Sequence, residues 1–236
     1  MFLTAREAAA LLACTERQIY RWVDEGEIPF QRVRDQLRFN RTDLLEWASV
    51  RRLAISLEAF DANLDPEDRT PSLMEALRVG GAHHDVPATD RDSALRAVVE
   101  RTPMPASLDR EFVVEILVAR ENAVSTAIGD GIAIPHVRQP VVAPGASPAV
   151  SVCYLRQPVS FGARDQKPVQ TIFLIVSPTI KVHLQMLAHL ARGLLDPGFR
   201  AALDRRASVE ELAVEAERFE SALSPEPPPR RSEGAD

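Results

Sequence analysis

The residues best suited to chemistry in this 236-residue chain are its histidines. His136 closes the run GDGIAIPH, in which strand alternation places Ile132 and Ile134 on one face if both point into the core. Pro135 removes a backbone donor and tends to end a strand, so we expect His136 to project at a strand edge, near solvent. A neutral imidazole there would be a good nucleophile near neutral pH, because its unperturbed pKa is ~6.5.

A nucleophile that accepts a phosphoryl group needs positive or hydrogen-donating groups around the developing charge. Arg120 lies sixteen residues before His136, at the end of a predicted helix, and would supply positive charge. His183 begins the predicted helix VHLQMLAHL, where free N–H groups favour anions and an imidazole can add a hydrogen bond. Arg120, His136 and His183 are therefore the candidate catalytic residues.

Other chemistries fit the spacing poorly. His183 and His189 are six positions apart, about 600° around a helix and so about 120° from alignment, whereas zinc-binding pairs prefer a separation of four. His83 and His84 are adjacent and would face opposite ways in a strand. No GxxxxGK[ST] phosphate loop is present, so direct use of ATP is not expected. We expect no metal site and no cofactor.

Helices and strands that could position these residues are mixed from residue 72 to 222. Helical periodicity and capping residues predict helices in segments 72–81, 93–102, 110–122, 182–195 and 208–223. Apolar, β-branched runs predict strands in segments 131–136, 148–161 and 169–178. Strands mixed with helices indicate an α/β or α+β domain.

The first 55 residues have the proportions of a helix-turn-helix. Thr4 and Glu7 form a capping-box pattern before one amphipathic segment, and Thr15 and Gln18 repeat it before the next. Segment 28–40 suggests a hairpin around a polar turn, and helical character resumes in RTDLLEWASVRRLA.

A second helix that buries Ile19, Trp22 and Val23 leaves arginine and glutamine on its other faces. These types can contact guanine and adenine edges, and the arginines of the hairpin are spaced to touch phosphates. The candidate DNA-contacting residues are Arg17, Gln18, Arg21, Arg32, Arg34 and Arg38. Residues 1–52 carry a net charge of only +1, and Asp35 sits at the hairpin tip, so we expect weak non-specific affinity and a need for a second copy. A protein-binding adaptor is the alternative interpretation.

Composition and charge predict the domain boundaries and the cellular compartment of the protein. The chain is 45% hydrophobic with a net charge of −6, and no apolar stretch approaches the ~20 residues of a membrane helix. Charges at Arg6 and Glu7 argue against a secretory signal, and two cysteines without a CxxC pattern fit a reducing cytoplasm. Residues 53–71 carry a net charge of −4 and two prolines, and the last fourteen residues hold four prolines. We therefore expect a helix-turn-helix domain at 1–55, a linker at 56–71, an α/β domain at 72–222 and a disordered tail at 223–236.

The N-terminal unit resembles the winged helix-turn-helix of the MerR/excisionase type. The resemblance lies in the opening LTAREAA, the run YRWVDEGEIP, a wing that ends in RF and the closing DLLEW. It implies a recognition helix at about 16–25 and a wing at about 30–39.

The second unit resembles the type-2 EIIA domain of the bacterial phosphotransferase system (PTS), nearest to its nitrogen-regulatory PtsN branch. The segments that carry the resemblance are LVARENAVSTAIGDGIAIPH, PVSFGARDQKPVQTIFLIVSP and KVHLQMLAHLARGLLDPGFRAAL. The resemblance implies a mixed sheet flanked by helices, His136 as the phosphorylated histidine, His183 as the second active-site histidine and Arg120 as the arginine of the REN motif. It also implies a histidine-phosphorylated HPr/NPr-like carrier as donor. Val137 stands where the family usually has a small residue, and its bulk could slow transfer or change the docking partner.

Together the two units predict a cytoplasmic, phosphorylation-responsive regulator. It would be a phosphohistidine carrier of the phosphotransferase type coupled to DNA binding and transcription regulation, with no membrane partner. The phosphoryl group adds about −1.5 to −2 charges, which could change docking between the domains or with a partner. One alternative is an interaction regulator that binds a kinase or transporter without binding DNA. Another is a sugar-PTS EIIA phosphocarrier component.

Overall fold

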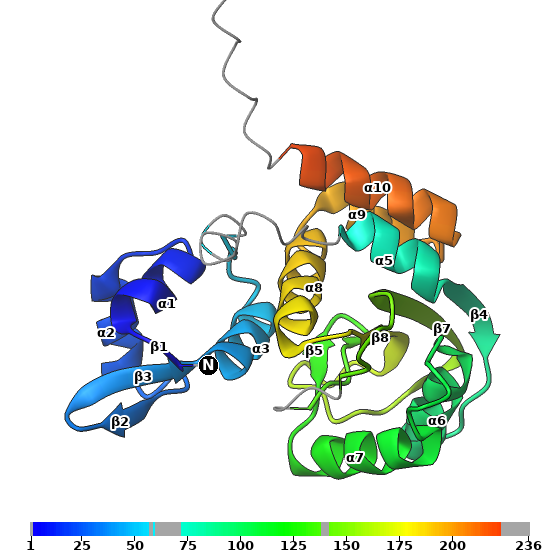
Figure 1. Cartoon of the computed structure of the whole chain (residues 1–236), viewed down its shortest axis with the longest axis horizontal. Helices are drawn as coiled ribbons and strands as arrows, with labels where there is room; N and C mark the ends of the chain where they lie inside the picture. The colour runs from blue at the N-terminus through cyan, green and yellow to red at the C-terminus, as the bar shows by residue number, and fades with distance from the viewer. Residues whose placement is uncertain (1, 57–58, 60–71, 138–141, 223–236) are drawn as a thin grey trace, which may run out of the picture.

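The computed structural model of the chain describes residues 2–56, 59, 72–137 and 142–222. It contains a small N-terminal unit and a larger unit built around a sheet, shown in blue and in cyan to orange in Figure 1. The linker expected at 56–71, apart from residues 56 and 59, and the tail expected at 223–236 lie outside the described residues. Among the residues the structure describes, no helix is long and apolar enough to cross a bilayer.

The N-terminal unit is a helix-turn-helix with a hairpin wing. Its elements are β1 (Phe2–Leu3), α1 (Ala5–Leu11), α2 (Glu16–Asp24), β2 (Gln31–Val33), β3 (Gln36–Asn40) and α3 (Arg41–Arg51). The Thr4–Glu7 capping box is confirmed, with the Thr4 side chain accepting from the Glu7 amide and the Glu7 carboxylate accepting from the Thr4 amide. Thr15 caps α2 by accepting from the Gln18 amide. The three strands form an antiparallel sheet in the order β1-β3-β2.

The second unit contains a five-stranded mixed sheet, which confirms the fold class. Its strands are β4 (Ala82–Val86), β5 (Ala127–Gly129), β6 (Ile132–Ala133), β7 (Ala149–Val159) and β8 (Val169–Val176), in the spatial order β4-β7-β8-β6-β5. The β4–β7 and β6–β8 pairs are parallel, and the other two pairs are antiparallel. The helices are α5 (Leu73–Gly80), α6 (Arg91–Arg101), α7 (Arg110–Ala123), α8 (Ile180–Gly193), α9 (Pro197–Asp204) and α10 (Val209–Ser221).

Helices cover both faces of the sheet, as Figure 1 shows. Ile132 and Ile134 belong to one buried apolar cluster with residues of α5, α8, α9 and α10, as strand alternation predicted. Ala133 points into a second cluster with residues of α6 and α7. The first cluster also takes in Leu44 and Leu45 of α3, so apolar packing is continuous from the N-terminal unit into the sheet domain.

Four elements were not foreseen from the sequence: the short strands β1 and β5, strand β4 and helix α9. Strand β4 carries two adjacent histidines and two half-buried residues at its start, so it lacks the apolar signature of a buried strand. Helix α9 has only eight residues, yet Asp196 caps it and Pro197 occupies its first turn. Strand β4 is buried by pairing with β7, which lies about seventy residues away, and α9 packs against the following helix α10 through Phe199 and Phe219.

Gly80 ends α5 where that helix crosses β7 at close range, and this contact predicts a large effect on stability. A Cβ at position 80 would lie 2.2 Å from both the carbonyl carbon and the oxygen of Val150. Because backbone atoms cannot yield as a flexible side chain does, we expect Gly80→Ala to lower the free energy of unfolding by about 3 kcal/mol. Val79→Ala, at an exposed neighbour on the same helix, should change it by less than about 1 kcal/mol. Urea unfolding followed by circular dichroism measures both, and equal midpoints for Gly80→Ala and the wild type would contradict this packing.

Candidate active site

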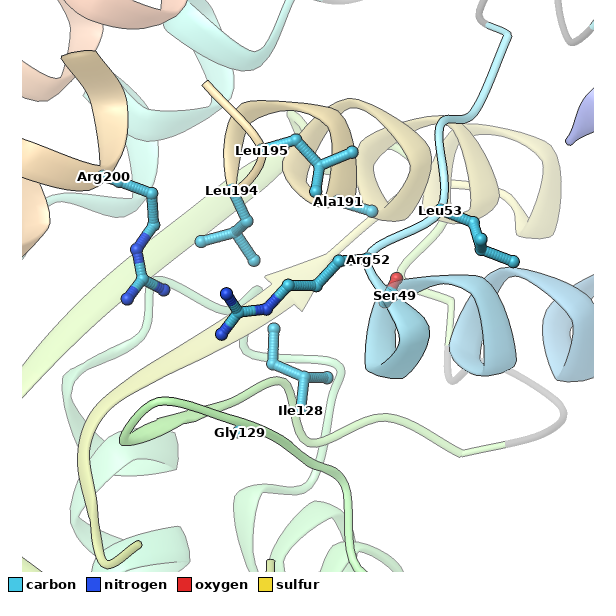
Figure 2. Close-up of a pocket in the computed structure, with 9 residues that line it drawn as sticks. All are labelled: Ser49, Arg52, Leu53, Ile128, Gly129, Ala191, Leu194, Leu195 and Arg200. Carbon is cyan, nitrogen blue, oxygen red and sulfur yellow. The ribbon is translucent and has the colours of Figure 1, made fainter. Parts of the chain in front are cut away.

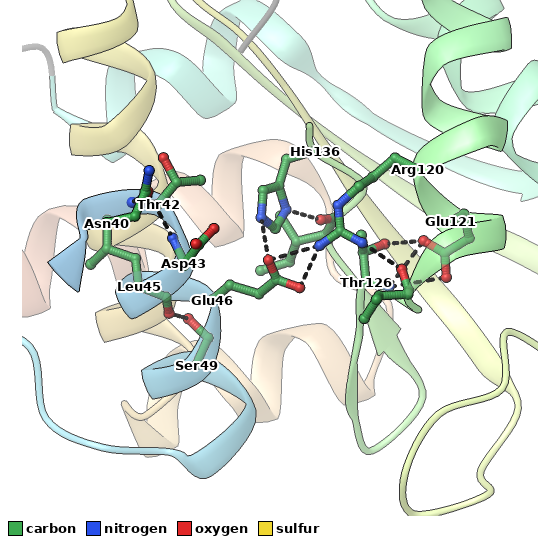
Figure 3. Close-up of polar contacts among 12 residues, drawn as sticks. Asn40, Thr42, Asp43, Leu45, Glu46, Ser49, Arg120, Glu121, Thr126 and His136 are labelled. Atoms are coloured by element: carbon green, nitrogen blue, oxygen red, sulfur yellow. Dashed lines mark hydrogen bonds and ion pairs between the residues drawn. The ribbon is translucent and has the colours of Figure 1, made fainter. Parts of the chain in front are cut away.

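His136 lies just past the end of β6, with its ring fixed by the backbone. Nδ1 is 2.6 Å from the carbonyl oxygen of Ile134. A carbonyl only accepts hydrogen bonds, so Nδ1 carries the proton and the lone pair of the neutral ring is on Nε2. The strand therefore holds a nucleophilic nitrogen in one orientation (Figure 3).

The expectation that His136 projects at a strand edge near solvent is wrong. Strand β6 lies between β8 and β5, so it is an interior strand of the sheet. Only 5% of His136 is exposed. Helix α3 of the N-terminal unit covers the ring, and the Oε2 atom of Glu46 on that helix lies 3.5 Å from His136 Nε2.

Arg120 lies in the last turn of α7, as predicted, and reaches the same carboxylate. Its Nη2 atom donates to both carboxylate oxygens of Glu46, at 2.7 and 2.8 Å, and its Nη1 atom donates to the Val124 carbonyl at 2.7 Å. Burial alone would raise the pKa of Glu46, but hydrogen bonding and charge from His136 and Arg120 outweigh it and hold the pKa below its usual range. An ionised carboxylate thus lies between the Arg120 guanidinium and the Nε2 edge of the His136 imidazole.

His183 lies in the first turns of α8, which is capped by Thr179. Both of its ring nitrogens are buried, and neither has a hydrogen-bond partner among the described residues. Burial, reinforced by the neighbouring His136, lowers the pKa of His183 to about 3, so its ring is neutral at physiological pH. His136 and His183 line a common cavity of about 30 Å³ whose other walls, including Val137, are apolar. The fold therefore brings all three predicted residues to one place.

Glu121, whose carboxylate connects two elements of this site by hydrogen bonds, was not identified from the sequence. Glu121, only 2% exposed, accepts hydrogen bonds from the amide and the hydroxyl of Thr126 at 3.0 and 2.5 Å. The Thr126 carbonyl in turn accepts from the Ile134 amide at 3.2 Å. This chain of bonds joins the end of α7, with Arg120, to the strand end that carries His136 (Figure 3). Its one sequence signal is that Glu121 directly follows the predicted arginine.

Glu46 was also missed, because α3 was interpreted only as a helix of the DNA-binding unit. Its expected apolar set included Leu44, Leu45 and Ala48, all of which are fully buried. Trp47 and Val50 place further apolar side chains on another side of the helix, and both are half-buried. Apolar residues on more than one side indicate a helix that packs against two partners.

The candidate DNA-contacting residues lie on α2 and on the β2–β3 hairpin, away from the sheet domain (Figure 1). Four of the six are exposed, and two are half-buried. The exposed residues are Arg17, Arg21, Arg32 and Arg34, and the half-buried ones are Gln18 and Arg38. The wing turns through Arg34 and Asp35, whose φ angles of 49° and 61° are both left-handed.

These features define a two-domain protein: a winged helix-turn-helix joined to a mixed α/β domain with a histidine–arginine–histidine cluster beside its central sheet. The chain belongs to the EIIA 2 family of the phosphoenolpyruvate-dependent sugar phosphotransferase system, whose family model matches residues 81–214. A helix-turn-helix family model matches residues 2–52.

Individual relatives agree with this assignment. A nitrogen regulatory protein of Escherichia coli (strain K12) is 32% identical over 148 residues, which span 61% of this chain and 89% of that protein. A PTS system fructose-specific EIIA component of Haloferax volcanii is 30% identical over 112 residues, or 45% of this chain and 71% of that protein. The crystal structure of the nitrogen regulatory protein IIA-Ntr from Neisseria meningitidis superposes with a TM-score of 0.51 at 28% identity, covering 61% of this chain and 98% of that one.

Proposed function

We propose that the protein is a phosphorylation-responsive regulator in which His136 accepts a phosphoryl group from a histidine-phosphorylated carrier of the HPr/NPr type. The observation that supports this most strongly is the bound carboxylate. Arg120 binds an oxyanion, the Glu46 carboxylate, that faces the Nε2 atom of His136. A site that binds a carboxylate there has the charge and the donors to bind phosphoryl oxygens.

In the transfer step, the Nε2 lone pair of His136 attacks the phosphorus atom of the carrier's phosphohistidine. The P–N bond to the carrier breaks, and its electron pair returns to the carrier's ring nitrogen. The Nδ1–H bond to the Ile134 carbonyl persists through the step, so no proton has to move. Arg120 neutralises the phosphoryl oxygens, and neutral His183 donates an N–H hydrogen bond to them without adding charge.

The rest of the chain would use this event as a signal. The winged domain, proposed to extend over residues 1–55, would bind DNA through α2 and the hairpin, and the domain at 72–222 would carry the phosphoryl group. Cys14 and Cys153 are both free thiols, which supports a reducing, cytoplasmic setting.

Incubation with phosphoenolpyruvate, Enzyme I and an HPr-like carrier tests the phosphoryl-transfer proposal. We expect the full-length protein to take up one phosphoryl group that is labile in acid and stable in base, as phosphohistidine is. Absence of label with every available carrier, while a known EIIA protein is labelled in parallel, would contradict the proposal.

The wing tip offers a test of DNA binding. Asp35 places a negative charge and a left-handed residue where the wing would approach phosphates. We expect Asp35→Gly to raise affinity for duplex DNA roughly three- to tenfold at low salt, since a repulsive charge is removed. It should also stabilise the domain by about 1 kcal/mol, since glycine adopts this φ without strain. Asp35→Asn tolerates the turn and removes only the charge, so it separates the two effects in a fluorescence anisotropy titration. Unchanged DNA affinity in both variants would count against a wing contact.

A protein-interaction regulator that does not bind DNA is the second candidate. The observation that favours it is the position of α3, which packs against the sheet domain as a docking helix would. Selection of binding sequences from random duplex DNA at low salt, with the protein shown to be dimeric, distinguishes DNA binding from the adaptor function. Enrichment of a sequence supports DNA binding, and its absence supports the adaptor.

A further inference from the structure

Helix α3 closes the His136 site in this structure. Its Glu46 carboxylate contacts Arg120 Nη2 with both oxygens and lies 3.5 Å from the nitrogen that would attack phosphorus. The side chains of Arg120, Glu46 and His136 are only 18%, 19% and 4% exposed. A phosphorylated carrier therefore has no direct path to Nε2 while α3 is seated.

The carboxylate also occupies the place that the transferred group would need. A phosphoryl group on Nε2 would present its oxygens to Arg120, where the Glu46 oxygens already lie. The two anions would otherwise share one guanidinium at contact distance, and like charges in a poorly solvated site repel strongly. Glu46 and a phosphoryl group on His136 thus exclude each other.

A second contact anchors the same helix farther along. Arg52, the residue that ends α3, forms an ion pair with Asp130 in the turn between β5 and β6. Asp130 also pairs with Lys167 at 2.8 Å and with Arg200 at 3.7 Å. A small pocket between the end of α3 and helix α8 lies at this contact (Figure 2).

We propose that the phosphoryl-acceptor face of the sheet domain is a docking surface for α3 of the same chain, with Glu46 as the internal competitor of the phosphoryl group. The proposal rests on the function proposed above. Docking closes the site to the carrier, and phosphorylation of His136 expels α3 and releases the winged domain from the sheet domain. Helix α2 and the hairpin stay exposed in the docked state. Docking therefore fixes the orientation of the DNA-binding surface relative to the sheet domain and leaves its accessibility unchanged.

Transfer rates from the phosphorylated carrier test this in the full-length chain. Glu46→Gln keeps the shape of the side chain and removes its charge. We expect it to raise the initial rate of His136 labelling at least roughly fivefold, the lower end of coupling between two linked sites. Arg52→Asn removes the second anchor with a residue that accepts the left-handed φ of 55°, and should also raise the rate without touching the reacting groups. Glu25→Gln, the same chemical change at a residue paired only with Arg21 in the hydrogen bonds described, is the matched control and should leave the rate unchanged.

A distance measurement follows the release of α3 directly. Spin labels on cysteines introduced at Tyr20 and Val214, which are 48% and 57% exposed, report the separation of the two domains in a Cys14→Ser background. Cys153 is fully buried and would not react with the label. We expect one short distance in the unphosphorylated wild type and a broad, longer distribution after phosphorylation. Glu46→Gln should shift part of the population in the same direction before phosphorylation.

The outcomes separate this inference from the proposed function. If neither the wild type nor any variant is labelled, the proposed function fails. If the wild type is labelled, but Glu46→Gln and Arg52→Asn are labelled no faster and phosphorylation leaves the distance unchanged, the docking proposal is overturned while phosphoryl acceptance stands. Faster labelling of both variants, together with the longer distance, supports it.

Discussion

His136→Ala is expected to take up no phosphoryl group from the carrier, whereas His183→Ala is expected to be labelled roughly 100-fold more slowly than the wild type. The difference follows from the geometry. The bond between Nδ1 of His136 and the Ile134 carbonyl directs Nε2 to the place where Arg120 binds the Glu46 carboxylate, so His136 is the residue placed to form the P–N bond. His183 is neutral and buried with unpartnered nitrogens, so it can donate one hydrogen bond to the transferred group but is not placed as the acceptor.

Radiolabel incorporation from phosphoenolpyruvate through Enzyme I and the carrier measures both variants. His84→Ala removes an exposed imidazole on β4 and serves as the control, with a rate equal to that of the wild type. Melting curves should show that His136→Ala folds, because loss of label in an unfolded protein decides nothing. Label that persists in folded His136→Ala would reject the site assignment.

Local signals in the sequence were sufficient for most of the fold. The Thr4 capping box begins α1 as predicted, because a cap depends on residues only three positions apart. Strand alternation correctly placed Ile132 and Ile134 on one face, and both lie in the same buried cluster. Strand β4 was missed because its stability comes from parallel pairing with β7, about seventy residues away, and its own side chains carry no apolar pattern.

The candidate site was predicted residue by residue, but its surroundings were not. Motif and order placed Arg120, His136 and His183 together, and the fold brings them to one cavity and one carboxylate. The burial of His136 could not be foreseen, because it depends on how a helix from one unit docks on another across a linker. Val137 is half-buried and packs against the apolar cluster under α6 and α7, so its bulk is accommodated there. Its effect on the transfer rate stays a prediction.

Arg120→Gln is expected to slow phosphoryl transfer to His136 by a factor of roughly 100 to 1,000, or about 2.7–4 kcal/mol of transition-state stabilisation. The guanidinium is the positive charge that the structure places opposite Nε2, as its hold on the Glu46 carboxylate shows. Glutamine keeps a hydrogen-bond donor but no charge, so it cannot neutralise three phosphoryl oxygens. Rapid-quench measurement at saturating carrier gives the rate of the chemical step, and a loss of less than about tenfold would contradict this role.

Arg120 has two effects that oppose each other, and a double-mutant cycle separates them. The substitution removes charge stabilisation from the transfer step, but it also removes the residue that holds Glu46 and therefore weakens the seat of α3. In the wild-type background the second effect hides part of the first, because an opened site accepts the carrier more readily. In the Glu46→Gln background the docking ion pair is already lost, so Arg120→Gln should reduce the transfer rate by a larger factor than it does in the wild type. The extra reduction should be about equal to the factor by which Glu46→Gln alone raises the rate. Additive effects of the two substitutions would mean that Arg120 and Glu46 act independently. Because the two side chains are in direct contact in this structure, that outcome would contradict the docking proposal most directly.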